Sequence, residues 1–310
     1  MLQQTRVETV IPYFERFMAR FPTPAALADA EEDDVLEQWS GLGYYRRARW
    51  LHAGVREVVS RYGAKVPEEP EDRLGLPGVG RYTAGAIGSI AFGRCEPIVD
   101  GNVARVFARL HAIGSPLGKA VTERALWSHA EALVQGTRPG DLNQGLMELG
   151  ARICTPRAPK CEGCPVRSMC AAHAQGRVAE LPVPRARKKP KRVQAVAVVA
   201  TRSGKVALVK RAGALFGGLW ELPVGEGHGR DEALAALRGA GIRSRLAGIP
   251  TGELEHVLTH RHMSVEVWKS TGARATQARW VGLDALDSVG TSRLTRRCIE
   301  HVFGPPLKKT

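Results

Sequence analysis

The first 170 residues of the chain carry apolar side chains at the spacing of amphipathic helices, and no alternating pattern interrupts them. In the first segment, for example, Val7, Val10 and Phe14 repeat in steps of three and four. Clusters of proline, glycine and polar residues separate the segments. Helices are therefore predicted over residues 1–21, 25–38, 51–62, 84–92, 102–111, 122–135 and 142–153.

From about residue 193 the pattern becomes that of β-strands. Residues 193–200 are β-branched and apolar, residues 205–210 resume after a turn, and residues 263–269 alternate apolar with polar side chains. A basic, proline-rich stretch at 176–192 precedes them and has the composition of an extended linker, either a DNA-contacting segment or a solvated tether. The expected architecture is multidomain, with an all-α part followed by an α+β domain.

Charge adds a partner to this picture. The 310 residues include 45 Lys and Arg against 31 Asp and Glu, which gives a net charge of +14. Such an excess favours a polyanionic partner, although a basic solvated surface produces the same balance. Because the sequence contains neither a run of eighteen apolar residues nor a signal peptide, a soluble protein inside the cell is expected.

Four of the six cysteines lie within seventeen residues, in the spacing C-x6-C-x2-C-x5-C. Thiols this close in a chain without an export signal are better explained as metal ligands than as disulfides. Zinc sites commonly use two C-x2-C pairs, whereas this chain has one, and the longer arms favour an iron–sulfur cube over zinc. The expected ligands are Cys154, Cys161, Cys164 and Cys170.

A second motif joins a tight turn to a carboxylate. Pro77, Gly78 and Gly80 form a turn that a side chain would obstruct, before a segment of helical composition. Backbone amides at such a helix N-terminus form a seat for an anion, for example a DNA phosphate. Asp100 follows about twenty residues later and is placed to act on what the turn holds. Alternatively, the turn merely joins two helices and Asp100 is an N-cap.

A third motif, residues 40–49, places two glycines around a leucine and follows them with two tyrosines and three arginines. Such a loop can push an apolar wedge between stacked bases while its cations hold phosphates. A buried loop that packs two helices has the same composition. Leu42 and Tyr44 are the expected wedge, and Arg46 is an expected phosphate contact.

Together these motifs resemble the helix-hairpin-helix DNA glycosylases, and specifically the MutY-type adenine DNA glycosylases. The hairpin with Asp100, the cysteine loop, the Gly-Leu-Gly-Tyr-Tyr segment and the opening Met-Leu-Gln-Gln-Thr all match, and residues 216–223 resemble a Nudix motif. The resemblance implies a helix-hairpin-helix domain with an iron–sulfur cluster loop, followed by an α+β Nudix-like domain. The implied boundaries are 1–108, 109–175 for the domain of one [4Fe-4S] cluster, 176–192 for the linker, and 193–305.

The implied activity is hydrolysis of adenine mispaired with 8-oxoguanine or guanine, after the nucleotide is flipped out of the duplex. Asp100 would face the oxocarbenium ion, while Tyr82 and Asn102 orient this carboxylate and the water. The implied partner is double-stranded DNA containing the mispair, bound by a monomer in the bacterial cytoplasm at the nucleoid, without a membrane. The expected DNA contacts are Gln3, Gln4, Thr5, Leu42, Tyr44, Arg46, Gly78, Gly80, Arg81, Thr259 and His260.

Two departures separate the chain from related activities. Endonuclease III carries a lysine nucleophile in the hairpin helix, where this chain has Tyr82, with Lys119 far from the motif. The Nudix pattern requires glutamates where this chain has Ala235, Arg238 and Gly239, so the C-terminal domain is expected to read a modified base rather than hydrolyse a pyrophosphate.

In the family the general acid is a glutamate two residues upstream of Met-Leu-Gln-Gln-Thr, a position that precedes Met1 here. The resemblance therefore implies an N-terminally short chain whose excision is impaired, since general-acid help contributes about 10²- to 10⁴-fold in rate. Two alternatives stay open at this point. One is a protein that binds the mispair without excising adenine, and the other is an endonuclease III-like glycosylase and lyase.

Overall fold

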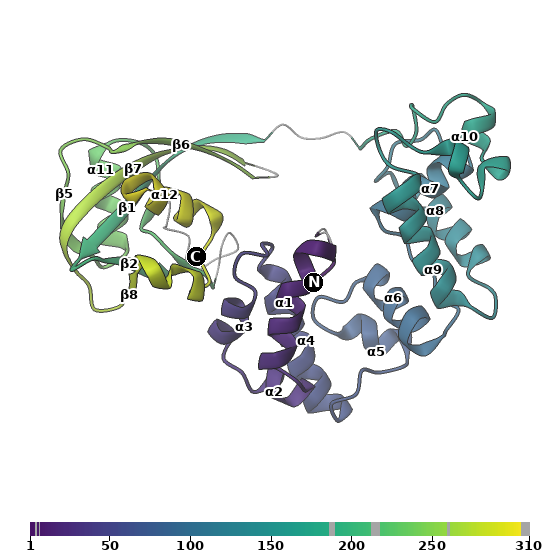
Figure 1. Ribbon diagram of the computed structural model, residues 1–310, viewed down its shortest axis with the longest axis horizontal. Coiled ribbons are helices and arrows are strands. Elements are labelled where there is room, and N and C mark those ends of the chain that lie inside the picture. Colours follow the sequence, from purple (N-terminus) through teal and green to yellow (C-terminus); the bar gives the residue numbers. More distant parts are fainter. Residues whose placement is uncertain (4, 6, 186–189, 212–217, 259–260, 305–310) are drawn as a thin grey trace. The chain divides into compact units, whose positions relative to one another are not determined.

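The computed structural model describes residues 1–3, 5, 7–185, 190–211, 218–258 and 261–304. The chain forms two compact units, of which unit 1 joins residues 1–56 to 188–310 and unit 2 comprises residues 57–187. Helix α4 (Arg46–Tyr62) begins in unit 1 and ends in unit 2 (Figure 1). Among the described helices, none is both long and apolar enough to cross a bilayer.

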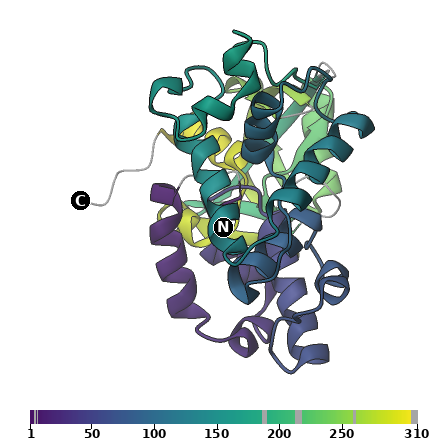
Figure 2. The same cartoon turned by 90° about the vertical axis from the view of Figure 1, so that its right-hand side faces the viewer.

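Unit 2 consists of helices and loops throughout its described residues, as the sequence predicts (Figure 2). Ile98, Val103, Phe107 and Leu126 form the centre of its core, and all four side chains are fully buried. The expected domain boundary at residue 108 falls inside a helix of this core. Its elements are α5 (Pro70–Gly75), α6 (Arg81–Phe92), α7 (Gly101–Leu110), α8 (Ala120–Leu133), α9 (Pro139–Glu148), a π-helical turn (Leu149–Ile153), two 3-10 turns (Cys161–Gly163 and Arg167–Met169) and α10 (Ala171–Ala174).

The N-terminal helices of unit 1 differ from the prediction in two places. Helix α1 (Val7–Arg20) begins six residues later than the predicted start. The predicted helix at 25–38 is two helices, α2 (Pro24–Ala28) and α3 (Glu32–Gln38). Thr23 caps α2 through a hydrogen bond from the Ala26 amide, and the extended backbone of Glu31 separates α2 from α3. The acidic first turn of α3 suits a new helix N-terminus, which explains why the break lies here.

The C-terminal part of unit 1 is a mixed sheet of eight strands with two helices. Its central strands β1 and β7 run parallel, in the order β3-β2-β1-β7-β5, while β4, β6 and β8 pair with β1, β7 and β2. The predicted strand at 205–210 agrees with β2. The strands are β1 (Lys191–Arg202), β2 (Lys205–Lys210), β3 (Trp220–Glu221), β4 (Val224–Glu226), β5 (Arg243–Leu246), β6 (Gly252–Val257), β7 (Arg261–Arg274) and β8 (Arg279–Gly282), with helices α11 (Arg230–Gly239) and α12 (Arg293–Phe303).

Strand β1 is apolar along most of its length because both of its faces are buried. Val193 and Val199 belong to the core that includes Leu294 of α12. Val198, on the opposite face, belongs to the core that includes Leu237 of α11. A strand covered on both sides reads as a continuous apolar run instead of an alternating one.

We expect the two isolated cysteines to react differently with a thiol reagent. Cys298 on α12 is fully buried, and burial raises the pKa of its thiol to about 12, whereas Cys95 is exposed. Since the thiolate is the reactive form, a maleimide should label Cys95 in the native protein and Cys298 only after unfolding. Peptide mapping by mass spectrometry checks this, with Cys95→Ser as the control. Labelling of Cys298 at the rate of Cys95 would contradict the described core.

Candidate functional site

The hairpin between α5 and α6 leaves a helix N-terminus open to an anion. Gly78 has φ of +77°, a conformation that favours glycine, so the turn requires it. Gly80 has φ of −93°, and a side chain there would meet no described atom within 4 Å. The predicted obstruction therefore applies to Gly78, while Gly80 leaves open space in front of α6. Gly80 is the N-cap residue of this helix and has no side chain to cap it.

A buried ion pair supports the hairpin from behind. The side chain of Arg73 on α5 is fully buried and pairs with Glu96 in the segment that leads to α7. Arg73 also donates to the carbonyl of Pro67, and Asn143 of α9 donates to the carbonyl of Glu96 at 2.9 Å. These bonds fix α5 and the segment at residue 96 relative to each other. The turn is thereby anchored on both sides of α6.

Arg81, the first residue of α6, is turned toward α8. Its guanidinium lies 3.7 Å from the ring centroid of Trp127 and 2.6 Å from the carboxylate of Glu131. More than half of the Arg81 side chain remains exposed. DNA contact by Arg81 stays a prediction, and it would have to compete with these two partners on α8.

Asp100 is the N-cap residue of α7, which confirms the alternative interpretation of this position. Its Oδ1 accepts hydrogen bonds from the amides of Asn102 at 2.9 Å and Val103 at 2.7 Å. Its Oδ2 accepts a longer bond of 3.3 Å from Nδ2 of Asn102. The capping bonds hold one oxygen and orient the other, and the positive end of the helix favours a carboxylate at this position. Capping and a chemical role are therefore compatible.

Tyr82 and Asn102 are both near Asp100 but contribute differently. Asn102 bonds directly to the carboxylate, whereas the hydroxyl of Tyr82 donates to Sδ of Met147 at 3.3 Å. Burial, together with the charge of Asp100, raises the pKa of the Tyr82 phenol, so it remains a neutral donor near pH 7. The structure thus supports orientation of Asp100 by Asn102, and it gives Tyr82 a different hydrogen-bond acceptor.

Two arginines on the buried face of α7 connect this carboxylate to the cysteine loop. Arg105 donates to Oδ1 of Asn102 at 2.9 Å and to the carbonyls of Gly150 and Cys154, both at 2.7 Å. Arg109 donates to the carbonyls of Thr155 and Leu181, both at 2.8 Å, and to Sγ of Cys154 at 3.3 Å. Both side chains are almost fully buried. Helix α7 therefore carries the candidate carboxylate at its start and the supports of the cysteine loop along its length.

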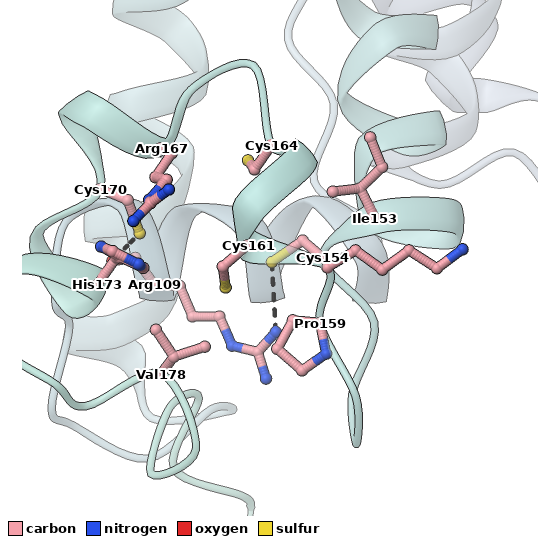
Figure 3. A pocket seen from close by; sticks show the side chains of 11 residues that line it. Arg109, Ile153, Cys154, Pro159, Cys161, Cys164, Arg167, Cys170, His173 and Val178 are labelled. Atoms are coloured by element: carbon pink, nitrogen blue, oxygen red, sulfur yellow. Dashed lines mark hydrogen bonds between the residues drawn. The ribbon is translucent and has the colours of Figure 1, made fainter.

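The four predicted cysteine ligands line one cavity. Figure 3 shows their sulfur atoms around this space, with Arg109 reaching Cys154 from α7. All four thiols are free, and burial together with the other three thiols raises the pKa of Cys161. Arg109, Lys160 and Arg167 also line the cavity, so positive charge surrounds a place where thiolates would be negative.

The arrangement of the thiols fits a cluster better than a single ion. All four thiols lie around the same cavity. A tetrahedral zinc site needs four ligands about 2.3 Å from one centre, whereas a cube spreads its thiolates around a larger body. The donor set therefore fits the iron–sulfur cube that the spacing predicts.

The predicted wedge is only partly on the surface of unit 1. We call residues 40–45 the wedge loop. Leu42 is 7% exposed and belongs to the core with Phe17 and Trp39, so it is packed inside instead of forming a wedge. Tyr44 is 59% exposed and has φ of +49°, a strained conformation for a residue with a side chain. Of the two predicted residues, Tyr44 is the exposed one, and its contact with a base stays a prediction.

Arg47 ties the N-terminal segment to the wedge loop. Its guanidinium donates to the carbonyls of Met1 and Gln3 and to Oγ1 of Thr5, and it lies 5.2 Å from the ring centroid of Tyr44. The predicted contacts Gln3 and Thr5 are thus held beside Tyr44. Arg46, in contrast, lies over Trp50 and is exposed. Gln4, Thr259 and His260 lie outside the described residues.

The sequence analysis missed Arg47, Arg105 and Arg109. Arg105 and Arg109 repeat at i and i+4 on the apolar face of α7, where a cation needs a buried partner, and this spacing was a usable signal. Arg47 lies among three arginines, and nothing local to the sequence distinguishes it from Arg46. The contacts that distinguish it come from Met1, Gln3 and Thr5.

Comparison with known proteins gives the class first. The model of the "HhH-GPD superfamily base excision DNA repair protein" family matches residues 1–131, that of the iron-sulfur binding domain of endonuclease III matches residues 154–170, and that of the NUDIX domain matches residues 195–301. A solved thermostable thymine-DNA glycosylase is 32% identical, with a TM-score of 0.49 over 56% of this chain and 80% of that one. The family models define a helix-hairpin-helix protein of base-excision DNA repair.

Named relatives identify the family within this class. The adenine DNA glycosylase of Rattus norvegicus is 38% identical over 357 aligned positions, which cover 96% of this chain and 69% of the rat protein. That of Homo sapiens is 51% identical over 56% of this chain and 32% of the human protein. The chain belongs to the adenine DNA glycosylase family and carries the family's iron–sulfur cluster loop and Nudix-like domain.

The helix of the Nudix-like domain that would hold a divalent ion is α11. Ala235 and Arg238 lie on it and Gly239 ends it, at the three places where the hydrolase pattern requires glutamates. Asp231 and Glu232 in its first turn are its acidic residues. That the Nudix-like domain does not hydrolyse pyrophosphates stays a prediction.

Purified protein should contain about four iron and four sulfide per chain and absorb visible light, as four cysteine ligands around a cube require. Replacing Cys161 by serine should lower the iron content and the visible absorbance, while Cys95→Ser should leave both unchanged because Cys95 is outside the cavity. Metal analysis and absorbance spectra check both variants. One zinc per chain without visible absorption would contradict the cube.

Proposed function

We propose that this chain hydrolyses the N-glycosidic bond of adenine mispaired with 8-oxoguanine or guanine in duplex DNA. The observation that carries the proposal is the position of Asp100, whose Oδ1 accepts hydrogen bonds from two amides of α7 while Asn102 donates to Oδ2. A fixed carboxylate of this kind suits the stabilisation of a positive charge that develops on a sugar. Family membership supplies adenine as the base.

The chemistry starts with a flipped nucleotide, because the bond is inaccessible inside the duplex. As the adenine leaves, an oxocarbenium ion develops at C1′ and the negative charge of Asp100 stabilises it, as in glycoside hydrolysis. Water then adds at C1′ and loses a proton, while the leaving adenine takes one up, so the products are free adenine and an abasic site. The open N-terminus of α6 behind Gly80 offers amides to a phosphate of the same strand, and Tyr44 offers an aromatic face to a neighbouring base.

The cluster has a supporting part in this scheme. A [4Fe-4S] cube bound by Cys154, Cys161, Cys164 and Cys170 would hold the loop after α9 in one conformation. Arg105 connects that loop, through the carbonyls of Gly150 and Cys154, with Asn102. The cluster loop thereby contributes to the position of the residue that orients Asp100.

The composition of the hairpin helix argues against the glycosylase and lyase alternative. Tyr82 stands where a lysine nucleophile would be needed, and no lysine occurs between residues 66 and 118. A chain without an amine at the site cannot form the Schiff base on which a lyase depends. The product should therefore be an abasic site in an uncut strand.

Asp100→Asn should lower the excision rate strongly while preserving the fold. Asparagine caps a helix about as well as aspartate, so α7 should keep its start, but the negative charge facing the sugar is lost. Electrostatic groups of this kind contribute about 10²- to 10³-fold in rate. Single-turnover assays on duplexes with adenine opposite 8-oxoguanine, guanine, cytosine and thymine would measure both the loss and the mispair preference.

Asp141→Asn is the matched control for this variant, because Asp141 also lies in the first turn of a helix, α9, and is exposed. It should excise adenine at the wild-type rate. An Asp100→Asn protein that is as active as this control would refute the proposed role, and equal rates opposite 8-oxoguanine and thymine would refute the mispair preference.

Borohydride treatment during turnover should trap no covalent complex with DNA. An enzyme that carries a lysine in its hairpin helix serves as the positive control and should be trapped under the same conditions. Gel electrophoresis separates free DNA from the complex. Efficient trapping that persists in Lys119→Ala would favour the glycosylase and lyase alternative.

A further inference from the structure

We propose that the wedge loop shares a hydrogen-bonded joint with the C-terminal part of unit 1, and that this joint sets the position of Tyr44 and contributes to the preference for the base opposite adenine. The inference rests on the proposed function, since it assigns further residues to the reading of that base. We call residues 289–292 the docking segment. Ser40, Tyr45 and Arg296 connect it to the loop.

Ser40 connects the loop to two elements of the C-terminal part. Its hydroxyl donates to the carbonyl of Val289 at 3.2 Å and accepts from Nη2 of Arg296 at 2.9 Å. Arg296 on α12 also donates to Oγ1 of Thr291 at 3.0 Å and to the carbonyl of Leu286 at 3.2 Å. The serine is 8% exposed, so these bonds are shielded from water and water does not readily replace them.

Tyr45 connects the other end of the loop to the same segment. Its hydroxyl donates to the carbonyl of Thr291 at 2.9 Å and accepts from the amide of Gly41 at 3.1 Å. One phenol therefore closes the loop on itself and fixes the closed loop to the docking segment. Ser40 and Tyr45 lie on either side of Tyr44 in the sequence, so both ends of the wedge are held.

Apolar contacts lie beneath these bonds. Leu219, which directly precedes β3, is 1% exposed and packs in the core with Leu36 and Trp39. At Gly290 a side chain would bring a Cβ within 3.2 Å of Cβ of Leu36, so the docking segment approaches α3 as closely as glycine permits. The contact is a packed interface and not a pair of isolated surface bonds.

The docking segment is equally fixed on its other side. The carboxylate of Glu221 on β3 is 1% exposed and accepts from the amide of Ser292 at 2.8 Å, from its hydroxyl at 2.7 Å and from Oγ1 of Thr295 at 2.7 Å. The amide of Trp220 donates to the carbonyl of Gly290 at 2.9 Å. Any shift of the sheet is therefore transmitted through the docking segment to both anchors of the wedge loop.

The strained backbone of Tyr44 explains why the anchors matter. A residue with a side chain at φ of +49° stays there only when its surroundings hold it, and here the anchors lie at both ends of a short loop with positive φ at Gly41 and Gly43. Loss of one anchor should let the loop relax and move the exposed ring. The C-terminal part, which would read the base opposite adenine, would then no longer fix the position of Tyr44, which would unstack that base.

Two variants test the joint, each with a matched control. Tyr45→Phe removes one hydroxyl, and its control Tyr62→Phe removes the hydroxyl of a half-buried tyrosine on α4 that bonds to Asp72. Arg296→Met removes one cation, and its control Arg297→Met removes the neighbouring cation of α12, which donates to the carbonyl of Glu255. Melting curves and iron content show whether each protein is folded.

Two readouts are measured for every variant. One is the ratio of the single-turnover excision rate opposite 8-oxoguanine to that opposite guanine. The other is the fluorescence of a 2-aminopurine placed next to the base opposite adenine, which rises when the stacking between these two bases is lost. Tyr45→Phe and Arg296→Met should lower the ratio by about five- to tenfold, the effect of one lost hydrogen bond. They should also lower the fluorescence rise, while both controls remain within about twofold of wild type.

Wild-type ratios and wild-type fluorescence in both Tyr45→Phe and Arg296→Met would overturn the joint. A wild-type protein that excises adenine opposite neither 8-oxoguanine nor guanine would instead refute the proposed function, and the fluorescence of the variants would still decide whether the joint positions Tyr44. If either variant fails to fold, Ser40→Ala replaces it, because Arg296 keeps Leu286 and Thr291 as acceptors. A uniform fall of both excision rates at an unchanged ratio would also count against the joint.

Discussion

The need to satisfy two buried guanidinium groups organises unit 2. Arg105 and Arg109 lie on the inner face of α7, where each exposes less than a tenth of its surface. A guanidinium offers five N–H donors, and burying them without acceptors would cost several kcal/mol, about 1 to 3 for each unsatisfied group. The carbonyls that accept them come from the loop after α9 and from Leu181. The cysteine loop is thus folded around α7, whose first turn holds Asp100.

The parts of the site that the sequence predicts are those whose residues are neighbours in the chain. The cysteine cavity follows from the spacing of four thiols within seventeen residues, and the turn follows from Gly78, whose positive φ is a local requirement. Asp100 and Asn102 are two residues apart, so their contact is also local. Spacing alone is sufficient for such features, because the chain has little freedom between the residues concerned.

Other parts depend on contacts that spacing does not reveal. Leu42 and Tyr44 flank Gly43 in one loop, and their spacing does not show which of them is buried. The backbone has positive φ at Gly43 and Tyr44, the leucine lies in the core and the tyrosine ring is exposed. Arg47 is distinguished by its contacts with Met1, Gln3 and Thr5, more than forty residues away in the sequence. Likewise, the association of the first 56 residues with residues 188–310 depends on Leu219 among the N-terminal helices, a pairing across most of the chain. Local patterns carry no information about such pairings.

The discontinuity of unit 1 has a consequence for the order in which the protein acquires its structure during synthesis. Residues 57–187 form a contiguous unit and can fold once they leave the ribosome, because their core lies within their own range. The core of the first helices, in contrast, is completed by Leu219, which is translated more than 150 residues after Leu36. At about 5 to 20 residues per second, the apolar faces of these helices wait roughly ten seconds or more for their last partner. That interval is when a nascent chain depends most on chaperones.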